Sequence, residues 1–170
     1  MPTLEQLRRE VWEANLGIRR AGLVTMHSGN ASGIDRARGL VIIKPNGVDY
    51  DRMRPADLVV TDLEGRKIKG RRKPSVDLPH HLYLYKRRPE IGGVIHTHSN
   101  YATSFALPDR SIPVYLTAIA DEFGVEIPCL PYVDNVGDHI GEAILKHMGK
   151  TPAILLSHRG VFTWGATPPP

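Results

Sequence analysis

The chain has 170 residues and carries 22 lysines and arginines against 18 aspartates and glutamates, giving a formal net charge of +4. This length predicts a single domain over residues 1–170, and 41% hydrophobic beside 24% charged residues excludes a disordered chain. The longest apolar runs fall far short of the about 20 residues that a membrane helix needs. We therefore expect no membrane partner. A single cysteine, Cys129, cannot form an internal disulfide, so we expect a cytoplasmic protein.

The positive charge is concentrated in two clusters, one over residues 67–73 and one over residues 86–88. Basic clusters indicate a nucleic-acid surface when they belong to a nucleic-acid-binding motif with interleaved aromatic residues. No such motif accompanies them here, which favours a solvated face or attraction for a small anion. We therefore expect no nucleic-acid partner.

Helical and strand patterns are mixed along the chain. Thr3 and Gln6 have the spacing of a capping box, and apolar residues then recur at helical spacing until Gly22, which predicts a first helix. The elements expected after it are, in chain order, strands over 40–43 and 58–61, a hairpin turn at 63–65, a helix over 77–85, a strand over 91–98, helices over 100–107 and 137–148, and strands over 153–156 and 161–164. This mixture indicates a layered α/β or α+β domain.

Two of the eight histidines, His96 and His98, stand two residues apart on the strand expected over 91–98. Alternate residues of a strand project from the same face, so both imidazoles can reach one metal ion. Three protein ligands and an open position are typical of catalytic zinc. The alternative is a surface pair of unrelated histidines.

Asp77 and His158 are the candidates for the remaining ligands. Asp77 opens the helix that leads into the His96 strand, and His158 stands at a strand-to-turn junction. The alternatives are a helix N-cap for Asp77 and an ordinary turn residue for His158. His80 and His81 are expected on the exposed face of their helix.

Six short motifs occur in an order and spacing that resemble those of the class II aldolase/adducin family, and in particular its epimerase branch. They are 28–32 (SGNAS), 43–47 (IKPNG), 73–77 (KPSVD), 93–99 (GVIHTHS), 127–129 (IPC) and 160–165 (GVFTWG). Together they span nearly the whole chain.

The resemblance implies a three-layer α/β/α sandwich with a central, largely antiparallel sheet, and a homotetramer with active sites at subunit interfaces. It implies one divalent ion per subunit, zinc or alternatively manganese, bound by His96 and His98 with Asp77 at or beside the metal. His158 is the candidate for the remaining histidine ligand. It places a sugar phosphate beside Gly29, Asn30, Lys44, Asn46, Gly47, Ser75 and Val76. Small residues in these positions let backbone amides approach a phosphate, and Lys44 adds positive charge.

The activity implied by the resemblance is epimerisation of L-ribulose 5-phosphate to D-xylulose 5-phosphate at carbon 4, a step of pentose metabolism. The bond between carbons 3 and 4 would be cleaved and re-formed on the other face, with zinc supplying Lewis acidity. Asp121 matches the family's catalytic carboxylate and is the acid/base candidate. The match rests on residues 120–124 (ADEFG), and without that context Asp121 would be interpreted as a surface acid.

The chain departs from the family pattern in three ways. The family's third zinc histidine directly precedes the glycine of the last motif, where this chain has Arg159, and His158 would need a local backbone shift to replace it. Asn46 and Val76 replace serines of the phosphate site. The family also continues beyond Gly165 with a helical region that carries a catalytic tyrosine, so we expect a C-terminally truncated, catalytically weakened form.

Two other functions remain open. A class II sugar-phosphate aldolase would carry a glutamate base where this chain has Asp77. A non-catalytic, adducin-like assembly domain has no need of Asp77, His96 and His98, which argues against it. Arg159 and the missing C-terminal region argue for it.

Overall fold

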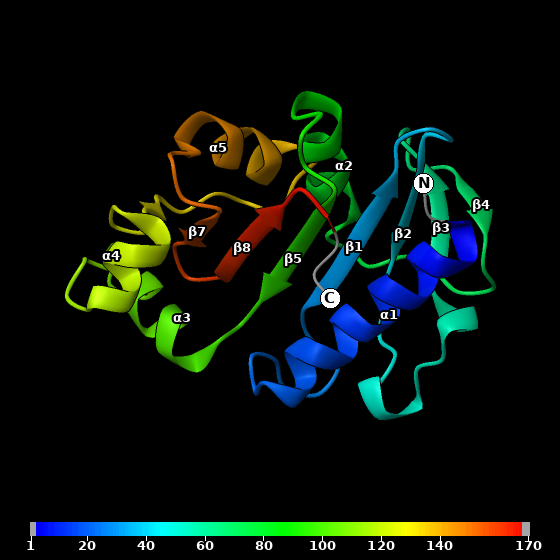
Figure 1. The fold of residues 1–170 in the computed structure, drawn as a ribbon, viewed down its shortest axis with the longest axis horizontal. Coiled ribbons are helices and arrows are strands. Elements are labelled where there is room, and N and C mark those ends of the chain that lie inside the picture. Colours follow the sequence, from blue (N-terminus) through cyan, green and yellow to red (C-terminus); the bar gives the residue numbers. More distant parts are fainter. Residues whose placement is uncertain (1–2, 168–170) are drawn as a thin grey trace.

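The computed structural model describes residues 3–167, which form an eight-stranded sheet with helices on both faces (Figure 1). The strand order is β4-β3-β2-β1-β5-β8-β7-β6, and every neighbouring pair is antiparallel except β6 with β7. The strands are β1 (Asn30–Asp35), β2 (Leu40–Ile43), β3 (Val59–Asp62), β4 (Lys67–Lys69), β5 (Gly93–Thr97), β6 (Cys129–Leu130), β7 (Ala153–Leu156) and β8 (Gly160–Gly165). The helices are α1 (Leu4–Arg20), α2 (Leu78–Arg87), α3 (Asn100–Ala106), α4 (Thr117–Phe123) and α5 (His139–His147), with 3₁₀ turns η1 (Tyr50–Arg52) and η2 (Pro55–Asp57). The expected layered sandwich with a largely antiparallel sheet is confirmed.

Helix α1 covers one face of the sheet over β1 and β2 (Figure 1). The Thr3 hydroxyl accepts from the Gln6 amide while the Gln6 side chain accepts from the Thr3 amide, so the expected capping box is present. Leu7, Val11 and Ile18 are buried against apolar residues of β2 and β3. The apolar stripe of the helix therefore fixes which of its faces meets the sheet.

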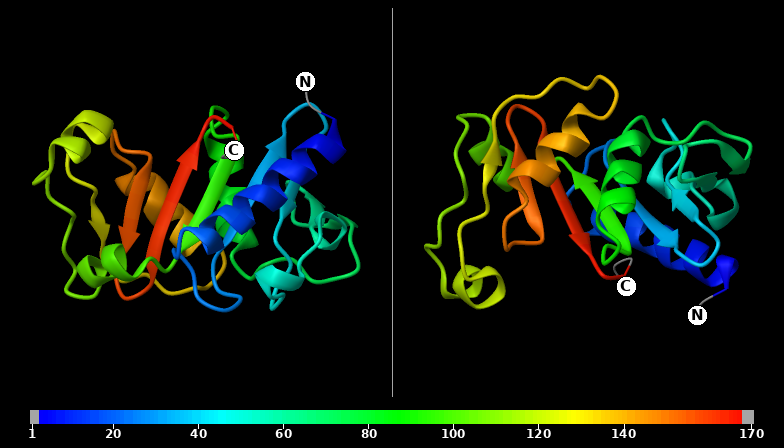
Figure 2. Two further views of the ribbon diagram at one scale, coloured as in Figure 1. Left: turned by 60° about the horizontal axis from the view of Figure 1, so that its bottom comes forward. Right: turned by 90° about the horizontal axis from the view of Figure 1, so that it is seen from above.

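Helices α2 and α5 pack together on the opposite face, which completes the three layers (Figure 2). Successive side chains of β7 and β8 point to opposite faces of the sheet. Phe162 and Ile154 pack into the core under α2 and α5, whereas Val161 and Leu155 pack into the core under α3 on the other face. None of the helices in residues 3–167 is long and apolar enough to cross a membrane.

Most of the expected elements are present within a few residues of their expected ends, including the β3–β4 hairpin and helix α2. Strand β1 was not expected, because its asparagine, serine and glycine are poor strand formers. It nevertheless lies in the middle of the sheet, between β2 and β5.

The expectation that His80 and His81 are exposed is wrong, because both are buried on the sheet-facing side of α2. The His81 Nδ1 lies 2.7 Å from the Ser32 hydroxyl of β1, and His80 Nε2 lies 2.7 Å from Asn135 Oδ1. Polar side chains of β1 and the 131–138 loop make this burial tolerable, and sequence spacing on one helix does not reveal such partners.

Candidate active site

One end of the sheet gathers the residues singled out by the sequence. Strands β1 and β8 begin at this end, and β2 and β5 finish there, because each is antiparallel to its neighbour in the order β2-β1-β5-β8. A cavity of about 460 Å³ opens there. Its lining includes Gly29, Asn30, Lys44, Asn46, Gly47, Ser75, Val76, Asp77, His96, His98, His158 and Arg159. The structure thus brings every expected site residue except Asp121 to one cavity.

Asp77 occupies the N-cap position of α2, yet its side chain makes no capping hydrogen bond. Its carboxylate instead accepts from the Asn30 side-chain amide, with an Nδ2–Oδ2 distance of 2.8 Å. The same amide donates to the Ser75 hydroxyl at 3.0 Å. Asp77 is buried and is oriented by β1, so its position serves the cavity rather than the helix end.

His96 on β5 and His98, the residue directly after that strand, form a T-shaped ring contact. Their Nε2 atoms lie 3.0 Å apart, and the His96 ring stacks on Phe162. His96 Nδ1 lies 3.0 Å from the Val161 carbonyl, so it donates there and leaves Nε2 as the acceptor. Burial lowers the pKa of His96 to about 4 despite the opposing charge of Asp77, and burial likewise lowers the pKa of His98. Both rings are therefore neutral at pH 7, the form that binds metals.

Arg159 reaches the same place from the turn before β8. Its Nη2 lies 3.5 Å from Asp77 Oδ1, and its Nε is buried without a hydrogen-bond partner in the described residues. Burial alone would raise the pKa of Asp77, but the surrounding imidazoles, Arg159 and the Asn30 hydrogen bond together lower it. The carboxylate is therefore ionised at neutral pH.

His158 is not brought to the histidine pair. It has a left-handed backbone, with φ 56°, and its exposed ring lies near Tyr132, with Nε2 3.8 Å from Asp109 Oδ1. Side chains alternate between the two faces of a strand only while the backbone is extended, and at His158 the backbone is not extended. His158 lies at the cavity, but its ring contacts are with Asp109 and Tyr132.

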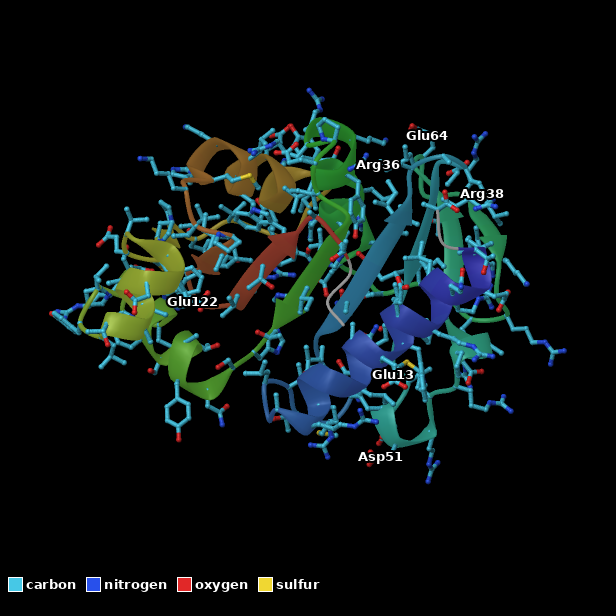
Figure 3. All side chains as sticks on the ribbon, in the orientation of Figure 1. Glu13, Arg36, Arg38, Asp51, Glu64 and Glu122 are labelled. Carbon is cyan, nitrogen blue, oxygen red and sulfur yellow. The ribbon has the colours of Figure 1, made fainter. Side chains whose placement is uncertain are left out.

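Asp121 lies on exposed helix α4 and does not line the cavity of its own chain. The adjacent Glu122, labelled in Figure 3, marks this helix at the end of the molecule beyond α3. The fold of one chain therefore does not bring Asp121 together with Asp77, His96 and His98.

Lys44 and Tyr50 hold the loop before β1 from one side. Lys44 Nζ donates to the His27 carbonyl at 2.9 Å, and the Tyr50 hydroxyl lies 2.8 Å from the Ser28 carbonyl. Burial lowers the pKa of Lys44 to about 8, although Asp49 and Asp77 oppose this shift. Tyr50 was not singled out by the sequence, since an isolated tyrosine after a turn gives no signal of such contacts.

A divalent metal fits only part of this site. The neutral imidazoles converge, and His96 ties its second nitrogen to a carbonyl as metal-bound histidines do. However, the Arg159 guanidinium lies beside Asp77, and within residues 3–167 no three His, Cys, Asp or Glu side chains form a group that could hold a metal ion. The expected four-ligand set is not assembled.

Comparison with known proteins identifies the family of this chain. The model of the Class II Aldolase and Adducin N-terminal domain matches residues 9–169. The chain is 42% identical over 173 aligned residues to proteins named L-ribulose-5-phosphate 4-epimerase UlaF from Salmonella paratyphi B and Salmonella typhi, covering 95% of this chain and 76% of each relative.

Solved structures share the fold. An L-fuculose 1-phosphate aldolase superposes with a TM-score of 0.84 at 26% identity, covering 97% of this chain and 77% of the aldolase. YgbL from Klebsiella pneumoniae gives the same TM-score at 25% identity, covering 99% of this chain and 82% of YgbL. The match of nearly the whole chain to one family model, together with the 42% identity, shows that this protein belongs to the class II aldolase/adducin family.

Proposed function

We propose that this chain catalyses the epimerisation of L-ribulose 5-phosphate at carbon 4, giving D-xylulose 5-phosphate. The observation that carries the proposal is the cavity in which Asp77, His96 and His98 meet Asn30 and Lys44, in a chain 42% identical to proteins named for this reaction. We place the reaction in the pentose metabolism of the cytoplasm.

The phosphate end of the substrate would lie against Gly29, Asn30, Lys44, Asn46, Gly47, Ser75 and Val76. Because the Ser28 carbonyl is held by Tyr50, the Gly29 amide of the same trans peptide points the opposite way. Gly29 has φ 71°, and a Cβ there would lie 2.5 Å from Val24 Cγ1 and 2.8 Å from the His96 carbonyl, so no larger residue fits. Lys44, protonated below its pKa of about 8, supplies positive charge for the phosphate.

The reacting carbons would lie at the Asp77 end of the cavity. Asn30 Oδ1 is buried without a hydrogen-bond partner among the described residues and is available to accept from a substrate hydroxyl. Removal of the carbon-4 hydroxyl proton breaks the bond between carbons 3 and 4. The electron pair passes to the carbonyl at carbon 2, giving glycolaldehyde phosphate and the enediolate of dihydroxyacetone. Rotation of the aldehyde and re-addition to its other face return the proton and invert carbon 4.

Asp121 is the proposed acid/base for one face, supplied by a neighbouring subunit of a homotetramer. Its exposed position on α4 supports this arrangement, because it leaves the carboxylate free to reach a second copy. A carboxylate accepts the hydroxyl proton and donates it back after re-addition.

Zinc, or alternatively manganese, would be held by His96 and His98 with help from Asp77, and His158 would join them only after a change in its backbone. When bound, such an ion supplies Lewis acidity to the ketone oxygen. Arg159 opposes it through like charge, so we expect weaker metal binding than three histidines give. Mass spectrometry of metal content tests this: Arg159→His raises bound zinc per chain, and His96→Ala removes it. Equal metal content in all three proteins contradicts the assignment.

The decisive activity test incubates the purified chain with L-ribulose 5-phosphate and follows D-xylulose 5-phosphate with a coupled dehydrogenase. The expected result is epimer formation without released aldehyde, abolished in Asp77→Asn and retained in Arg38→Gln, which lies far from the cavity. The structural likeness to an L-fuculose 1-phosphate aldolase supports the second candidate, a sugar-phosphate aldolase. Accumulation of free aldehyde without epimer would establish that candidate instead.

A further inference from the structure

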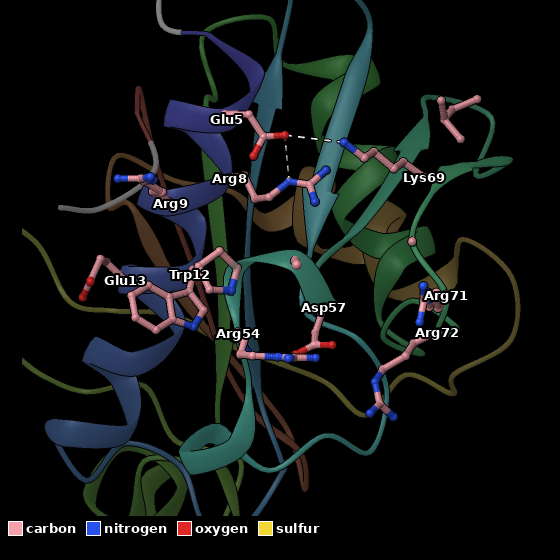
Figure 4. Close-up of a pocket in the computed structure, with 14 residues that line it drawn as sticks. Glu5, Arg8, Arg9, Trp12, Glu13, Arg54, Asp57, Lys69, Arg71 and Arg72 are labelled. Atoms are coloured by element: carbon pink, nitrogen blue, oxygen red, sulfur yellow. Dashed lines mark hydrogen bonds and ion pairs between the residues drawn. The ribbon is translucent and has the colours of Figure 1, made fainter.

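A second cavity lies on the α1 side of the molecule, between the start of α1, the 3₁₀ turn η2 and strand β4 with the loop after it (Figure 4). Its volume is about 1140 Å³, and it shares no lining residue with the candidate active site. Part of its wall, residues 68–72, is the basic cluster that the proposed function does not use.

The lining is strongly positive. Six cationic side chains line the cavity against three carboxylates; the cations are Arg8, Arg9, Arg54, Lys69, Arg71 and Arg72. The carboxylates are already engaged: Glu5 lies 3.5 Å from Lys69 and 3.8 Å from Arg8, and Asp57 lies 3.2 Å from Arg54. The third, Glu13, pairs with Arg20 outside the cavity.

Three arginines of this wall form no ion pair in the described residues, although the charge of Arg72 helps to lower the pKa of Asp57. In the part of the chain that the structure describes, no carboxylate comes within ion-pair distance of Arg9, Arg71 or Arg72. Clustered like charges repel one another, and a bound anion relieves that repulsion. The wall therefore presents a site for a molecule with more than one negative charge.

Arg8 is the unusual member of this set, because its side chain is only 5% exposed. Its Nε and Nη2 atoms are buried without any hydrogen-bond partner in the described residues, and its contact with Glu5 is too long for a hydrogen bond. A buried guanidinium with unused N–H groups is costly unless something accepts from them. Its planar fork matches the oxygens of a phosphate group.

Trp12 provides a different kind of surface in the same cavity. Its indole Nε1 donates to the Met53 carbonyl at 2.8 Å, which fixes the ring, and the half-buried ring lies between Glu13 and Arg54 in Figure 4. A fixed aromatic face stacks well against a planar ring.

We propose that this cavity binds a phosphorylated organic anion of the nucleotide class. Arg8 supplies a buried positive charge at one end of the cavity, Arg71 and Arg72 neutralise the remaining negative charge of the phosphates, and the planar base stacks on Trp12. The proposal is independent of the proposed epimerase activity, since the two cavities share no residue.

Fluorescence of Trp12 provides a local test. The chain has two tryptophans, so Trp164→Phe leaves Trp12 as the single emitter. Titration of this protein with ADP is expected to give a saturable change in emission, and tripolyphosphate, which has no ring, is expected to bind more weakly. No saturable change at millimolar ADP overturns the proposal, and equal affinity for tripolyphosphate overturns the role of Trp12.

Two double variants that remove the same number of positive charges distinguish a specific binding site from general electrostatic attraction of ADP to the protein. Arg71→Gln with Arg72→Gln is expected to weaken ADP binding about ten-fold or more, because two charge-assisted contacts are lost. Arg87→Gln with Arg110→Gln removes the same charge from exposed positions elsewhere and is expected to leave binding unchanged. Equal weakening in both contradicts a built site.

Size-exclusion chromatography of the same proteins tests the competing occupant, a second copy of the chain. An unchanged elution volume for the Arg71/Arg72 variant supports the nucleotide site. Dissociation of an oligomer in that variant, without ADP binding by the parent protein, would assign the cavity to a subunit contact and overturn the proposal.

Discussion

The ion pair between Arg159 and Asp77 gives the sharpest prediction about the candidate site. At the observed separation of 3.5 Å, two unit charges interact by about 5 kcal/mol at an effective dielectric constant of about 20. The Arg159 side chain is 25% exposed, so solvent screening and desolvation reduce the net contribution to about 1–3 kcal/mol. We therefore expect Arg159→Met to lower the free energy of unfolding by about 1–3 kcal/mol at pH 7.

The pH dependence of this loss identifies the partner. The lowered pKa of Asp77 stabilises the folded state above the unfolded value of 3.8, and that stabilisation is lost as the pH falls through the folded value. The difference between Arg159→Met and the parent chain is therefore largest at pH 7 and closes at acidic pH. Urea unfolding followed by circular dichroism at several pH values measures it.

Arg20→Met is the matched control, because Arg20 lies 3.4 Å from Glu13 but both side chains are exposed, at 67% and 48%. The loss of this pair is expected to change stability by less than about 0.5 kcal/mol. If the two variants lose the same small amount, or the loss in Arg159→Met does not depend on pH, Arg159 does not hold Asp77 ionised.

Three further predictions concern groups around the same cavity. Burial lowers the pKa of His81 to about 3 from an unfolded value of 6.5. Its contribution to the free energy of unfolding is therefore complete above pH 6.5 and decreases as the pH falls below that value. His81→Asn should reduce the loss of stability on acidification, measured by urea unfolding at several pH values. Lys44, with a pKa of about 8, attracts phosphate only when protonated, so KM for the sugar phosphate should rise above pH 8 in the parent chain and lose this dependence in Lys44→Gln. Gly160→Ala places a Cβ in overlap with the Thr97 carbonyl oxygen of β5 and should cost about 1–3 kcal/mol of stability. Gly17→Ala, in an open helical position, should be neutral or stabilising, and equal melting temperatures for the two variants would contradict the packing argument.

Local sequence patterns predicted much of the fold. The capping box at Thr3, helical spacing to Ile18 and the branched residues of β2 and β7 each depend on nearby residues, so their structure follows from short-range chemistry. The central strand β1 escaped prediction because its polar and small residues gain their stability only from strands on both sides.

The candidate site could be predicted in composition but not in geometry. The sequence motifs identified Asp77, His96 and His98 as candidate site residues. Only the folded chain shows that the Asn30 side chain donates hydrogen bonds to both Asp77 and Ser75, which lie more than forty positions away in the sequence. The burial of His81 is a second case, because its partner Ser32 belongs to a distant strand.

The turn before β8 shows most clearly what the sequence determined and what the tertiary structure determined. The sequence alone established that Arg159 stands where the family resemblance requires a histidine, since residue identity is all that this comparison needs. Only the tertiary structure decided which side chain enters the site. The left-handed conformation of His158 places its ring beside Asp109 and Tyr132 and leaves Arg159 beside Asp77. A strand's alternation predicts side-chain direction only while the backbone stays extended, and the charge of Asp77 then selects the guanidinium.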